Sequence, residues 1–452
     1  MMREPPFQLL PRPAPIPMVG RRVLVLGLGD TGLSVARWIE REGGKVRVAD
    51  SRTDPPRKKD FGGELHTGEF SPALLEGIDV VCTSPGLPLD HEVIRNAVAR
   101  NLPVIGDIEI FAWHARSSVL AVTGTNGKST VTALTGHLLR SAGVDCEVAG
   151  NIGPPVLEAF LKRLGSGKPP RAWVLELSSY QLETTWSLAP HAAAMLNLTA
   201  DHLDRYRSLD DYAAAKARIF EGAHVRIANR DDPRSLAMAR GGSKVVSFGL
   251  DAGKDFGLKD GVLVEGTTEI LRADALQIHG AHNIANALAA CALASSLQIP
   301  LSKIKQGLRT FRGLPHRLEL VAHRRGVDWY DDSKGTNVGA TIAALRGLGR
   351  KTLLILGGEG KGQDFSPLRG PVKEFASYVL LIGRDALLIE RQLAGIRVER
   401  CGSLEDAVQQ AAALAKPGEA VLLSPACASF DMFRDYKHRG EAFAAAVRKL
   451  DA

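Results

Sequence analysis

One stretch near residue 120 constrains this chain more than any other, because it joins a short apolar run to a glycine-rich turn and a helical pattern. Residues 119–122 are all apolar, which is typical of a buried strand. The turn Gly-Thr-Asn-Gly-Lys-Ser-Thr occupies 124–130, and residues 131–139 have helical periodicity. Strand, glycine turn and helix in this order predict a polyphosphate site, because backbone N–H groups at a helix start face the anion.

The residue types in this turn fit that chemistry. Gly124 and Gly127 let the backbone approach phosphates, Lys128 places a charge on the terminal phosphates, and the Ser129 hydroxyl can bind Mg²⁺. The full Walker pattern has another glycine at position 122, where this chain has valine. A structural glycine turn before an ordinary helix therefore stays open as an alternative. The candidate ATP-binding residues of the turn are Gly124, Thr125, Asn126, Gly127, Lys128, Ser129 and Thr130.

Length and composition favour a globular protein of about three domains, since domains average about 150 residues and the chain has 452. Its 45% hydrophobic and 24% charged content is ordinary for a soluble protein. The five cysteines contain no CxxC pair, which favours buried thiols in a reducing compartment. Residues 1–20 are proline-rich and lack the apolar region of a signal peptide, so we expect a disordered leader.

The formal charge of +7 does not identify a partner. Lysine and arginine are dispersed and form no basic stripe interleaved with aromatics, so small acidic substrates fit this charge at least as well as nucleic acid does. The longest charge-free stretch, 284–302, contains Asn286 and Gln298 and is typical of a buried helix followed by a turn. We expect a cytoplasmic protein, a monomer, with no membrane insertion and no nucleic-acid partner.

The first predicted domain, 21–106, carries a dinucleotide-type fingerprint. A strand at 22–26 precedes a Gly-x-Gly-x-x-Gly turn at 27–32 and a helix at 33–42, and a second strand ends at Asp50. A strand at 79–83 then leads into a turn ending at Gly86. The fingerprint alone leaves NAD, another nucleotide and a structural glycine turn as alternatives.

The second predicted domain, 107–312, adds three candidate groups to the phosphate loop. Glu176 lies near the end of an apolar strand, where a carboxylate can hold Mg²⁺ or cap the next turn. The strand at 193–198 delivers a loop with Asp201, His202 and Asp204, whose density of acidic and imidazole groups indicates a metal and substrate site. Lys216 lies on an alanine-rich helix. It either extends to solvent or is half-buried with a lowered pKa, and a neutral amine near a cation can react with CO₂ to form a carbamate.

The third predicted domain, 313–452, alternates strands and helices. Strands at 327–331, 352–356, 378–382 and 420–423 are each followed by a polar cluster. These clusters predict a cleft at the carboxyl edge of a doubly wound sheet.

Taken together, the motifs resemble those of the Mur ligases of peptidoglycan synthesis. Gly-Thr-Asn-Gly-Lys-Ser-Thr, Glu-Leu-Ser-Ser-Tyr-Gln ending at 181, Asp-His-Leu-Asp-Arg-Tyr from 201, the helix lysine, His-Asn-x-x-Asn from 282, Leu-Pro-His-Arg ending at 317 and Asp-Ser-Lys from 332 appear in order. The match runs from about residue 21 to the end. Segments 332–337 and 423–440 resemble the members that add D-glutamate. Under this resemblance the first domain holds a uridine diphosphate sugar and not NAD.

The resemblance implies an α/β fold of three domains: a Rossmann-like UDP-binding domain, a central P-loop ATPase-like domain with a parallel sheet, and a C-terminal Rossmann-like domain. It implies an ATP-dependent ligase that joins D-glutamate to UDP-N-acetylmuramoyl-L-alanine through an acyl phosphate. The third domain would swing closed on binding. The alternatives are a related amide ligase with another amino acid or a folate substrate, a P-loop nucleic-acid motor and an NAD-dependent oxidoreductase.

The resemblance also implies residue roles. Two Mg²⁺ ions would be held by Ser129, Glu176, His202 and a carbamylated Lys216, with Lys128 on the phosphates. Further ATP contacts would come from Asn283, Asn286, Arg317 and Asp332. The UDP-sugar would contact Asp30, Thr31, Asp50, Ser51, Arg52 and Gly86, with Asn151, Gln181 and His202 nearer its reacting end. D-glutamate would contact Lys334, Thr336, Lys361, Ser429 and Tyr436.

Overall fold

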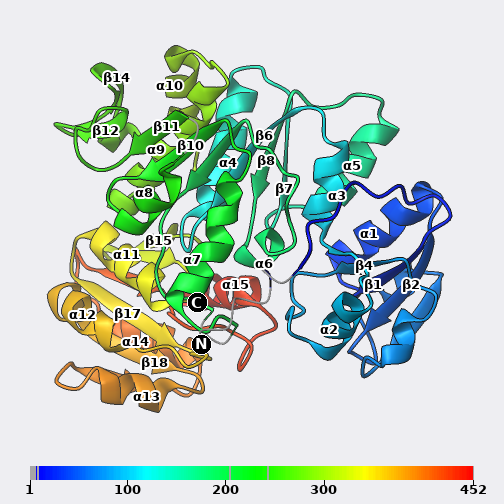
Figure 1. Cartoon of the computed structure of the whole chain (residues 1–452). Helices are drawn as coiled ribbons and strands as arrows, with labels where there is room; N and C mark the ends of the chain where they lie inside the picture. The colour runs from blue at the N-terminus through cyan, green and yellow to red at the C-terminus, as the bar shows by residue number, and fades with distance from the viewer. Residues whose placement is uncertain (1–6, 8–9, 203–204, 242–243, 451–452) are drawn as a thin grey trace.

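Three sheets follow one another along the chain in the computed structural model, which describes residues 7, 10–202, 205–241 and 244–450 (Figure 1). The first sheet has the order β3-β2-β1-β4-β5 and is parallel throughout. Its strand order changes direction at β1, which is where ligands bind in open α/β sheets. Its elements are β1 (Arg22–Leu26), α1 (Asp30–Arg41), β2 (Lys45–Asp50), β3 (Glu64–Thr67), β4 (Val80–Thr83), α2 (Glu92–Ala99) and β5 (Val104–Ile105).

The central sheet has nine strands in the order β14-β13-β12-β11-β10-β9-β6-β8-β7. In this sheet order, the neighbouring strands β11, β10, β9, β6, β8 and β7 pair in parallel. Strands β12, β13 and β14 form an antiparallel meander at one edge. The strands are β6 (Ser118–Thr123), β7 (Cys146–Gly150), β8 (Ala172–Glu176), β9 (Ala192–Met195), β10 (Val225–Asn229), β11 (Lys244–Phe248), β12 (Phe256–Lys259), β13 (Val262–Glu265) and β14 (Thr268–Arg272).

Helices cover both faces of this sheet, so both faces are apolar and the strands are buried. One buried cluster includes Leu120, Val122 and the apolar residues of α4 and α9, and another continues into the first domain. The helices are α3 (Asp107–His114), α4 (Lys128–Ser141), α5 (Val156–Gly165), α6 (Ser179–Leu182), α7 (Leu209–Ala217), α8 (Pro233–Ala239), α9 (Ala281–Ser296) and α10 (Leu301–Thr310).

The third sheet has the order β15-β16-β20-β17-β18-β19, with only β15 antiparallel to its neighbour. Separate buried clusters fill its two faces. The three-domain α/β fold class is therefore confirmed. The elements are β15 (Glu319–Arg324), β16 (Val327–Asp331), α11 (Val338–Leu348), β17 (Thr352–Gly357), α12 (Arg369–Phe375), β18 (Ala376–Ile382), α13 (Ala386–Gln392), β19 (Val398–Arg400), α14 (Leu404–Leu414), β20 (Ala420–Leu423) and α15 (Tyr436–Lys449).

The sheets suggest where the domains divide. The first sheet ends at Ile105, the second extends from Ser118 to Arg272, and the third begins at Glu319. We propose domain limits of 21–106, 107–312 and 313–452. Among the described helices, none combines the length and the apolar character that crossing a membrane requires.

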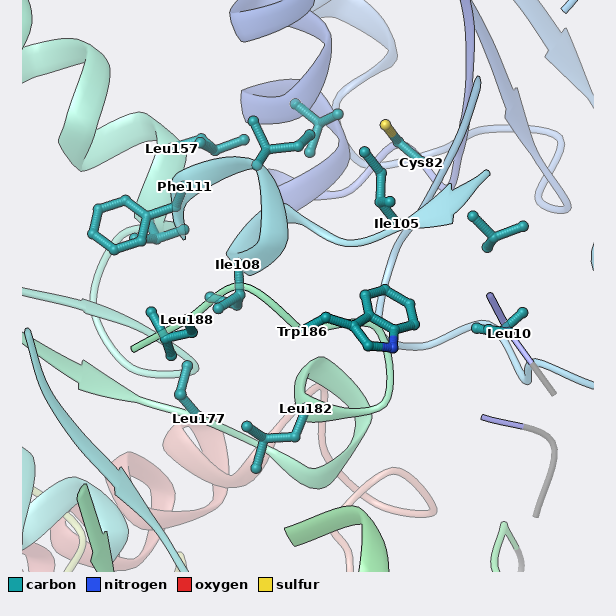
Figure 2. Close-up of a cluster of buried hydrophobic side chains, with 14 of the residues drawn as sticks. Leu10, Cys82, Ile105, Ile108, Phe111, Leu157, Leu177, Leu182, Trp186 and Leu188 are labelled. Carbon is teal, nitrogen blue, oxygen red and sulfur yellow. The ribbon is translucent and has the colours of Figure 1, made fainter. Parts of the chain in front are cut away.

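The expectation of a disordered leader over 1–20 is wrong for its described residues. Phe7, Leu10 and Met18 are 3%, 6% and 4% exposed and belong to the buried cluster that joins the first two domains. Figure 2 shows Leu10 in this cluster with Trp186 and Ile105. The Phe7 ring also lies 5.8 Å from the Arg218 guanidinium of the central domain. Prolines dominate the composition of this segment and its apolar side chains are widely spaced, so the sequence pattern did not indicate that they are buried. Residues 1–6, 8 and 9 lie outside the described part of the chain.

Helix α3, which directly follows the first domain, is held to the rest of the central domain by a buried carboxylate. Glu109 is fully buried and accepts hydrogen bonds from Trp113 Nε1 at 2.9 Å, from the Trp186 and Ser187 N–H groups at 2.6 and 2.8 Å, and from Ser187 Oγ at 2.6 Å. These bonds join α3 to the segment after α6.

Replacing Glu109 by alanine is expected to lower the free energy of unfolding by about 3 kcal/mol, because buried donors lose their acceptor. Urea unfolding followed by tryptophan fluorescence measures the change. The exposed Glu405 on α14 supplies the control, Glu405→Ala, with an expected change of at most about 0.5 kcal/mol. Equal effects of the two substitutions would contradict this role for Glu109.

Candidate active site

The glycine turn forms a phosphate-type loop between β6 and α4. Gly124 has φ +152° and Gly127 has φ +84°, a left-handed conformation at the N-cap of α4. A Cβ on Gly127 would lie 2.4 Å from Asn286 Oδ1, and one on Gly124 would lie 3.0 Å from Leu196 Cβ. Both positions therefore need glycine, and the loop exposes the first N–H groups of α4 to an anion.

Lys128 begins α4 and folds back over the loop. Its Nζ donates to the carbonyl oxygens of Gly124 and Thr125 at 3.0 and 2.8 Å. Burial lowers the pKa of Lys128, although the charges of Glu176 and Asp201 favour the ammonium form. The side chain is thus preorganised next to the loop that the sequence predicts for phosphates.

Glu176 is the last residue of β8 and lies beside β6 in the sheet. It is 2% exposed, and its Oε1 accepts a hydrogen bond from Asn151 Nδ2 at 2.7 Å. Its Oε2 is buried without a hydrogen-bond partner among the described residues. A buried carboxylate oxygen without a donor fits a cation ligand, because burying it alone is costly.

Lys216 is 1% exposed, so it does not extend to solvent and is more deeply buried than the half-buried position expected. Its Nζ donates to Gly124 O at 2.8 Å and lies 4.7 Å from the centre of the Tyr212 ring. Burial, followed by the nearby Lys128 charge, lowers the pKa of Lys216 well below its usual value. A lowered pKa favours the neutral form of the amine, which is the form that reacts with CO₂.

His202 completes the predicted metal group from the loop after β9. Its backbone has φ +56°, and its Nε2 lies 3.8 Å from Asp201 Oδ2. The Tyr180 ring packs against the imidazole at a centroid distance of 5.0 Å. Asp204, which the sequence placed in the same loop, lies outside the described residues.

One cavity of about 640 Å³ brings together groups from the central and third domains. The phosphate loop, the four candidate metal ligands, Arg317, and Lys334, Thr336 and Lys361 all line it. A neighbouring cavity of about 300 Å³ is lined by Thr130, Asn283, Asn286 and Asp332. It also shares Asn126, Gly127, Arg317 and Lys334 with the first cavity, so the candidate ATP residues surround a continuous region.

Arg317 and Asp332 connect this region to the third domain. Arg317 Nη2 donates to Ser129 Oγ at 2.6 Å, across the junction. Asp332 accepts from Ser424 Oγ at 2.7 Å and from the Leu318 N–H at 3.2 Å. Burial raises the pKa of Asp332 to about 7, even though Ser424 and Arg317 favour its charged form.

Of the candidate D-glutamate residues of the third domain, Lys334, Thr336 and Lys361 line the main cavity, whereas Ser429 and Tyr436 do not. Lys334 Nζ lies 4.0 Å from the centre of the Tyr436 ring, at the start of α15. Burial, followed by the charge of Arg317, lowers the pKa of Lys334 to about 8. Ser429 is 2% exposed in the turn after β20, and Lys361 is exposed and adopts φ +51°.

The first-domain candidates lie at the carboxyl ends of β1, β2 and β4, away from the residues that line the two cavities. Asp30, Ser51, Arg52 and Gly86 are exposed, Thr31 is half-buried and Asp50 is buried. Asn151 is exposed next to Glu176, whereas Gln181 is buried and its Oε1 accepts from the Ser178 N–H and hydroxyl in a capping box.

Asp50 does not present a free carboxylate to a ribose. One oxygen accepts from the Leu28 N–H at 2.7 Å, and Arg52 bonds both oxygens at 2.7 and 2.8 Å. Burial raises the pKa of Asp50, but the hydrogen bonds from Arg52 and Leu28 outweigh it and lower the pKa to about 2. Its carboxylate instead fixes the exposed Arg52 guanidinium.

Sequence reasoning assigned no role to several residues of the main cavity. Tyr180, Tyr212 and Asn337 line it, and Asn197 holds the loop by accepting from the Asn126 N–H at 2.8 Å. Asn197 follows β9, so the strand-end rule could have identified it. Asp201 was expected in the metal and substrate loop, and it also lines the main cavity. Asn337 follows Thr336 directly, but its contacts come from residues far away in the sequence.

Three family models match consecutive parts of the chain. They describe a Mur ligase MurD-like N-terminal domain at 21–106, a Mur ligase middle domain at 122–294 and a Mur ligase glutamate ligase domain at 316–427. Relatives named UDP-N-acetylmuramoylalanine–D-glutamate ligase include those of Thiobacillus denitrificans, 53% identical over 96% of this chain and 97% of the relative, and Nitrosospira multiformis, 50% identical over 96% of each.

Solved structures of lower identity share the fold. The UDP-N-acetylmuramate–alanine ligase of Thermotoga maritima has a TM-score of 0.61 at 18% identity, covering 95% of this chain and 99% of that chain. A type C pseudomurein peptide ligase of Methanothermus fervidus has a TM-score of 0.60 at 20% identity, covering 95% and 100%. Domain order, loop geometry and these matches agree: the chain belongs to the Mur ligase family.

Proposed function

We propose that this chain is an ATP-dependent ligase that joins D-glutamate to UDP-N-acetylmuramoyl-L-alanine in peptidoglycan precursor synthesis. The main support is the single cavity of about 640 Å³ in which the phosphate loop faces Lys334, Thr336 and Lys361. A nucleotide site and a cationic pocket for a small acid thus open into one space. The corresponding enzyme name is carried by relatives whose sequences are about 50% identical to this one over nearly the whole chain.

The reaction needs ATP because a carboxylate is a poor acylating agent. In the proposed mechanism, the alanyl carboxylate attacks the γ-phosphorus of ATP and releases ADP, which leaves an acyl phosphate. The D-glutamate amine then attacks the acyl carbon, and the tetrahedral intermediate expels phosphate and loses a proton. Phosphoryl transfer depends mainly on positioning and charge neutralisation, so Lys128 and the N–H groups of the loop are placed to act on the phosphates.

Ser129, Glu176, His202 and a carbamylated Lys216 would hold two Mg²⁺ ions. The buried Glu176 Oε2 without a donor supports this set, as does the low pKa of Lys216. A carbamate would turn a cationic side chain into an anionic oxygen ligand, which Mg²⁺ prefers. The ions would neutralise phosphate charge during transfer.

The first domain would bind the UDP-sugar at the carboxyl edge of its sheet. Asp50 aligns Arg52 beside Ser51, while Asp30, Thr31 and Gly86 come from the neighbouring strand ends. Asn151 and Gln181 would lie nearer the reacting carboxylate, with His202. Because both Asp50 oxygens are already bonded, the ribose contact expected of an NAD site is not available from that carboxylate.

The remaining ATP contacts would come from both sides of the domain junction. Asn283 and Asn286 open α9 and are 7% and 8% exposed, and Arg317 and Asp332 lie opposite them. Because two domains share one nucleotide, we also propose that the third domain closes on binding. Identical small-angle scattering with and without substrates would contradict closure. We further propose a cytoplasmic monomer; the described cysteines, all free, fit a reducing compartment.

Lys334 gives the D-glutamate pocket an expected pH dependence. Its pKa of about 8 means that it is charged below pH 8 and neutral above it. Inhibition by glutarate, a dicarboxylate without the amine, is therefore expected to weaken severalfold between about pH 7 and pH 9. Steady-state inhibition constants measure this change. In Lys334→Gln the inhibition should be weaker and independent of pH over this range; an equally steep profile in the variant would assign the titration to another group.

Phosphate release tests the proposed function most simply. The full-length protein is incubated with ATP, Mg²⁺ and UDP-N-acetylmuramoyl-L-alanine, and one amino acid is added at a time. Release with D-glutamate, but not with L-glutamate, L-alanine or a diamino acid, is the expected result. Release with a different amino acid would retain a ligase and overturn the assigned D-glutamate pocket.

A further inference from the structure

An asparagine outside the assigned site residues joins the third domain to the phosphate loop. Asn337 directly precedes α11 and is 4% exposed. Its Oδ1 accepts from the Ala340 N–H at 2.8 Å and so caps the helix. This bond fixes the orientation of the side-chain amide before any contact with the central domain is considered.

The rest of the Asn337 amide is directed across the domain junction. Its Nδ2 donates to Asn126 Oδ1 and to Asp201 Oδ2, both at 3.2 Å. Its Oδ1 also accepts from Asn126 Nδ2 at 3.4 Å. An asparagine amide has two donors and two acceptor positions, so this side chain is fully used.

Both partners of Asn337 belong to loops of the candidate active site in the central domain. Asn126 lies between Gly124 and Lys128, and its main chain is held on both sides by Asn197, at 2.8 and 3.0 Å. Asp201 precedes His202. The backbone of the phosphate loop is therefore anchored inside the central domain, and the side chain of Asn126 is the part that reaches α11.

Close packing accompanies the hydrogen bonds. A Cβ on Gly339, in the first turn of α11, would lie 3.2 Å from Thr199 Oγ1 and 3.4 Å from Asn126 Nδ2. The absence of a side chain there lets α11 approach the loop. The segment that connects β16 to α11 also carries Lys334 and Thr336, so its position relative to the phosphate loop decides where an amino acid in that pocket meets the acyl group.

We propose that Asn337 is a positioning residue. Through its hydrogen bonds to Asn126 and Asp201, it fixes the position of the amino-acid pocket relative to the phosphate loop. This inference rests on the proposed ligase function. It assigns Asn337 no contact with substrate. Its effect is to hold the amine of the incoming amino acid in line with the acyl phosphate.

The substitution Asn337→Asp separates this role from helix capping. Aspartate caps helices as well as asparagine does, so the bond to Ala340 and the stability of α11 are retained. It replaces both donated hydrogens by oxygen lone pairs and places a second carboxylate opposite Asp201. Asn337→Ser also retains a capping group, but its side chain is too short to reach the central domain and adds no charge.

We expect kcat/KM for D-glutamate to fall by about 10-fold to 100-fold in both variants, since small displacements of reacting groups have effects of this size. Binding of UDP-N-acetylmuramoyl-L-alanine, measured by calorimetry, and the thermal unfolding midpoint should stay at their wild-type values. The control is Ser403→Ala, which removes the cap of the distant α14, where Ser403 Oγ accepts from Asp406 N at 3.0 Å. It should lower the unfolding midpoint and leave kcat/KM unchanged.

A double-mutant cycle gives the second readout. Asn126→Ala and Asn337→Ser should each lower kcat/KM, and the double variant should lose less than the product of the single effects. Wild-type kcat/KM in both Asn337 variants, fully independent effects in the cycle, or an equal loss of UDP-sugar binding would overturn the proposal. If the wild-type enzyme shows no release with D-glutamate, the proposed function fails instead, which distinguishes the two failures.

Discussion

Replacing Lys216 by alanine is expected to lower kcat on the order of 1,000-fold, because the side chain would supply an anionic metal ligand beside the phosphates. Lys216 is 1% exposed, and its pKa is lowered well below the usual value by burial and by Lys128. A permanent ammonium at this position would oppose the binding of Mg²⁺. A carbamate at Lys216 would account for the burial of this side chain beside the loop.

Addition of formate or acetate should partly restore the activity of Lys216→Ala, because a small carboxylate can occupy the space of the carbamate. Steady-state phosphate release at increasing carboxylate concentrations measures the rescue. Removal of dissolved CO₂ should lower wild-type activity, and bicarbonate should restore it. The exposed Lys303 provides a matched control, since Lys303→Ala should behave as wild type. A fully active Lys216→Ala variant, or one that carboxylates never rescue, would contradict the carbamate.

Replacing Lys128 by alanine is expected to lower kcat/KM for ATP by about 100-fold to 1,000-fold, the usual effect of removing one donor to a developing charge. Lys128 Nζ contacts the Gly124 and Thr125 carbonyls and begins the helix whose N–H groups face the loop. Lys128→Arg should not restore activity, because a planar guanidinium does not replace a compact ammonium in a tight loop.

Two measurements separate the effect of Lys128 on catalysis from an effect on folding. Single-turnover phosphate release gives the rate of the chemical steps, and thermal unfolding shows whether the variant retains its fold. The exposed Lys305 supplies the control Lys305→Ala. A Lys128→Ala enzyme with a wild-type rate would show that the loop alone carries the phosphate chemistry.

Local patterns were sufficient to predict much of the fold. The strands at 22–26, 327–331 and 420–423 have the predicted bounds, and in the first and the last of these a short apolar run lies between turn residues. The glycine turn and the strand-end position of Glu176 follow from the same local signals, whereas the sequence left the burial of Lys216 open. Helix starts were less accurate: α1 begins at Asp30, three residues before the predicted start, directly after the glycine turn.

Contacts between distant segments were not predictable in this way. The pair Asn126–Asn337 is 211 residues apart, and nothing in either local pattern indicates the other. Phe7 was missed because its partners, Arg218 and the domain junction, are equally remote. Asp50 was predicted from the spacing of a nucleotide fingerprint, but only the structure shows that Arg52 and Leu28 occupy both of its oxygens.

We expect this site to form an acyl phosphate, and oxygen transfer from the substrate to the released phosphate tests that step. UDP-N-acetylmuramoyl-L-alanine labelled with ¹⁸O in its alanyl carboxylate is converted with ATP, Mg²⁺ and D-glutamate, and the released phosphate is analysed by mass spectrometry. If the carboxylate attacks the γ-phosphorus, each phosphate formed carries one oxygen from the labelled carboxylate. Product formation with unlabelled phosphate would contradict the acyl phosphate and, with it, the roles assigned to the phosphate loop and the metal ligands.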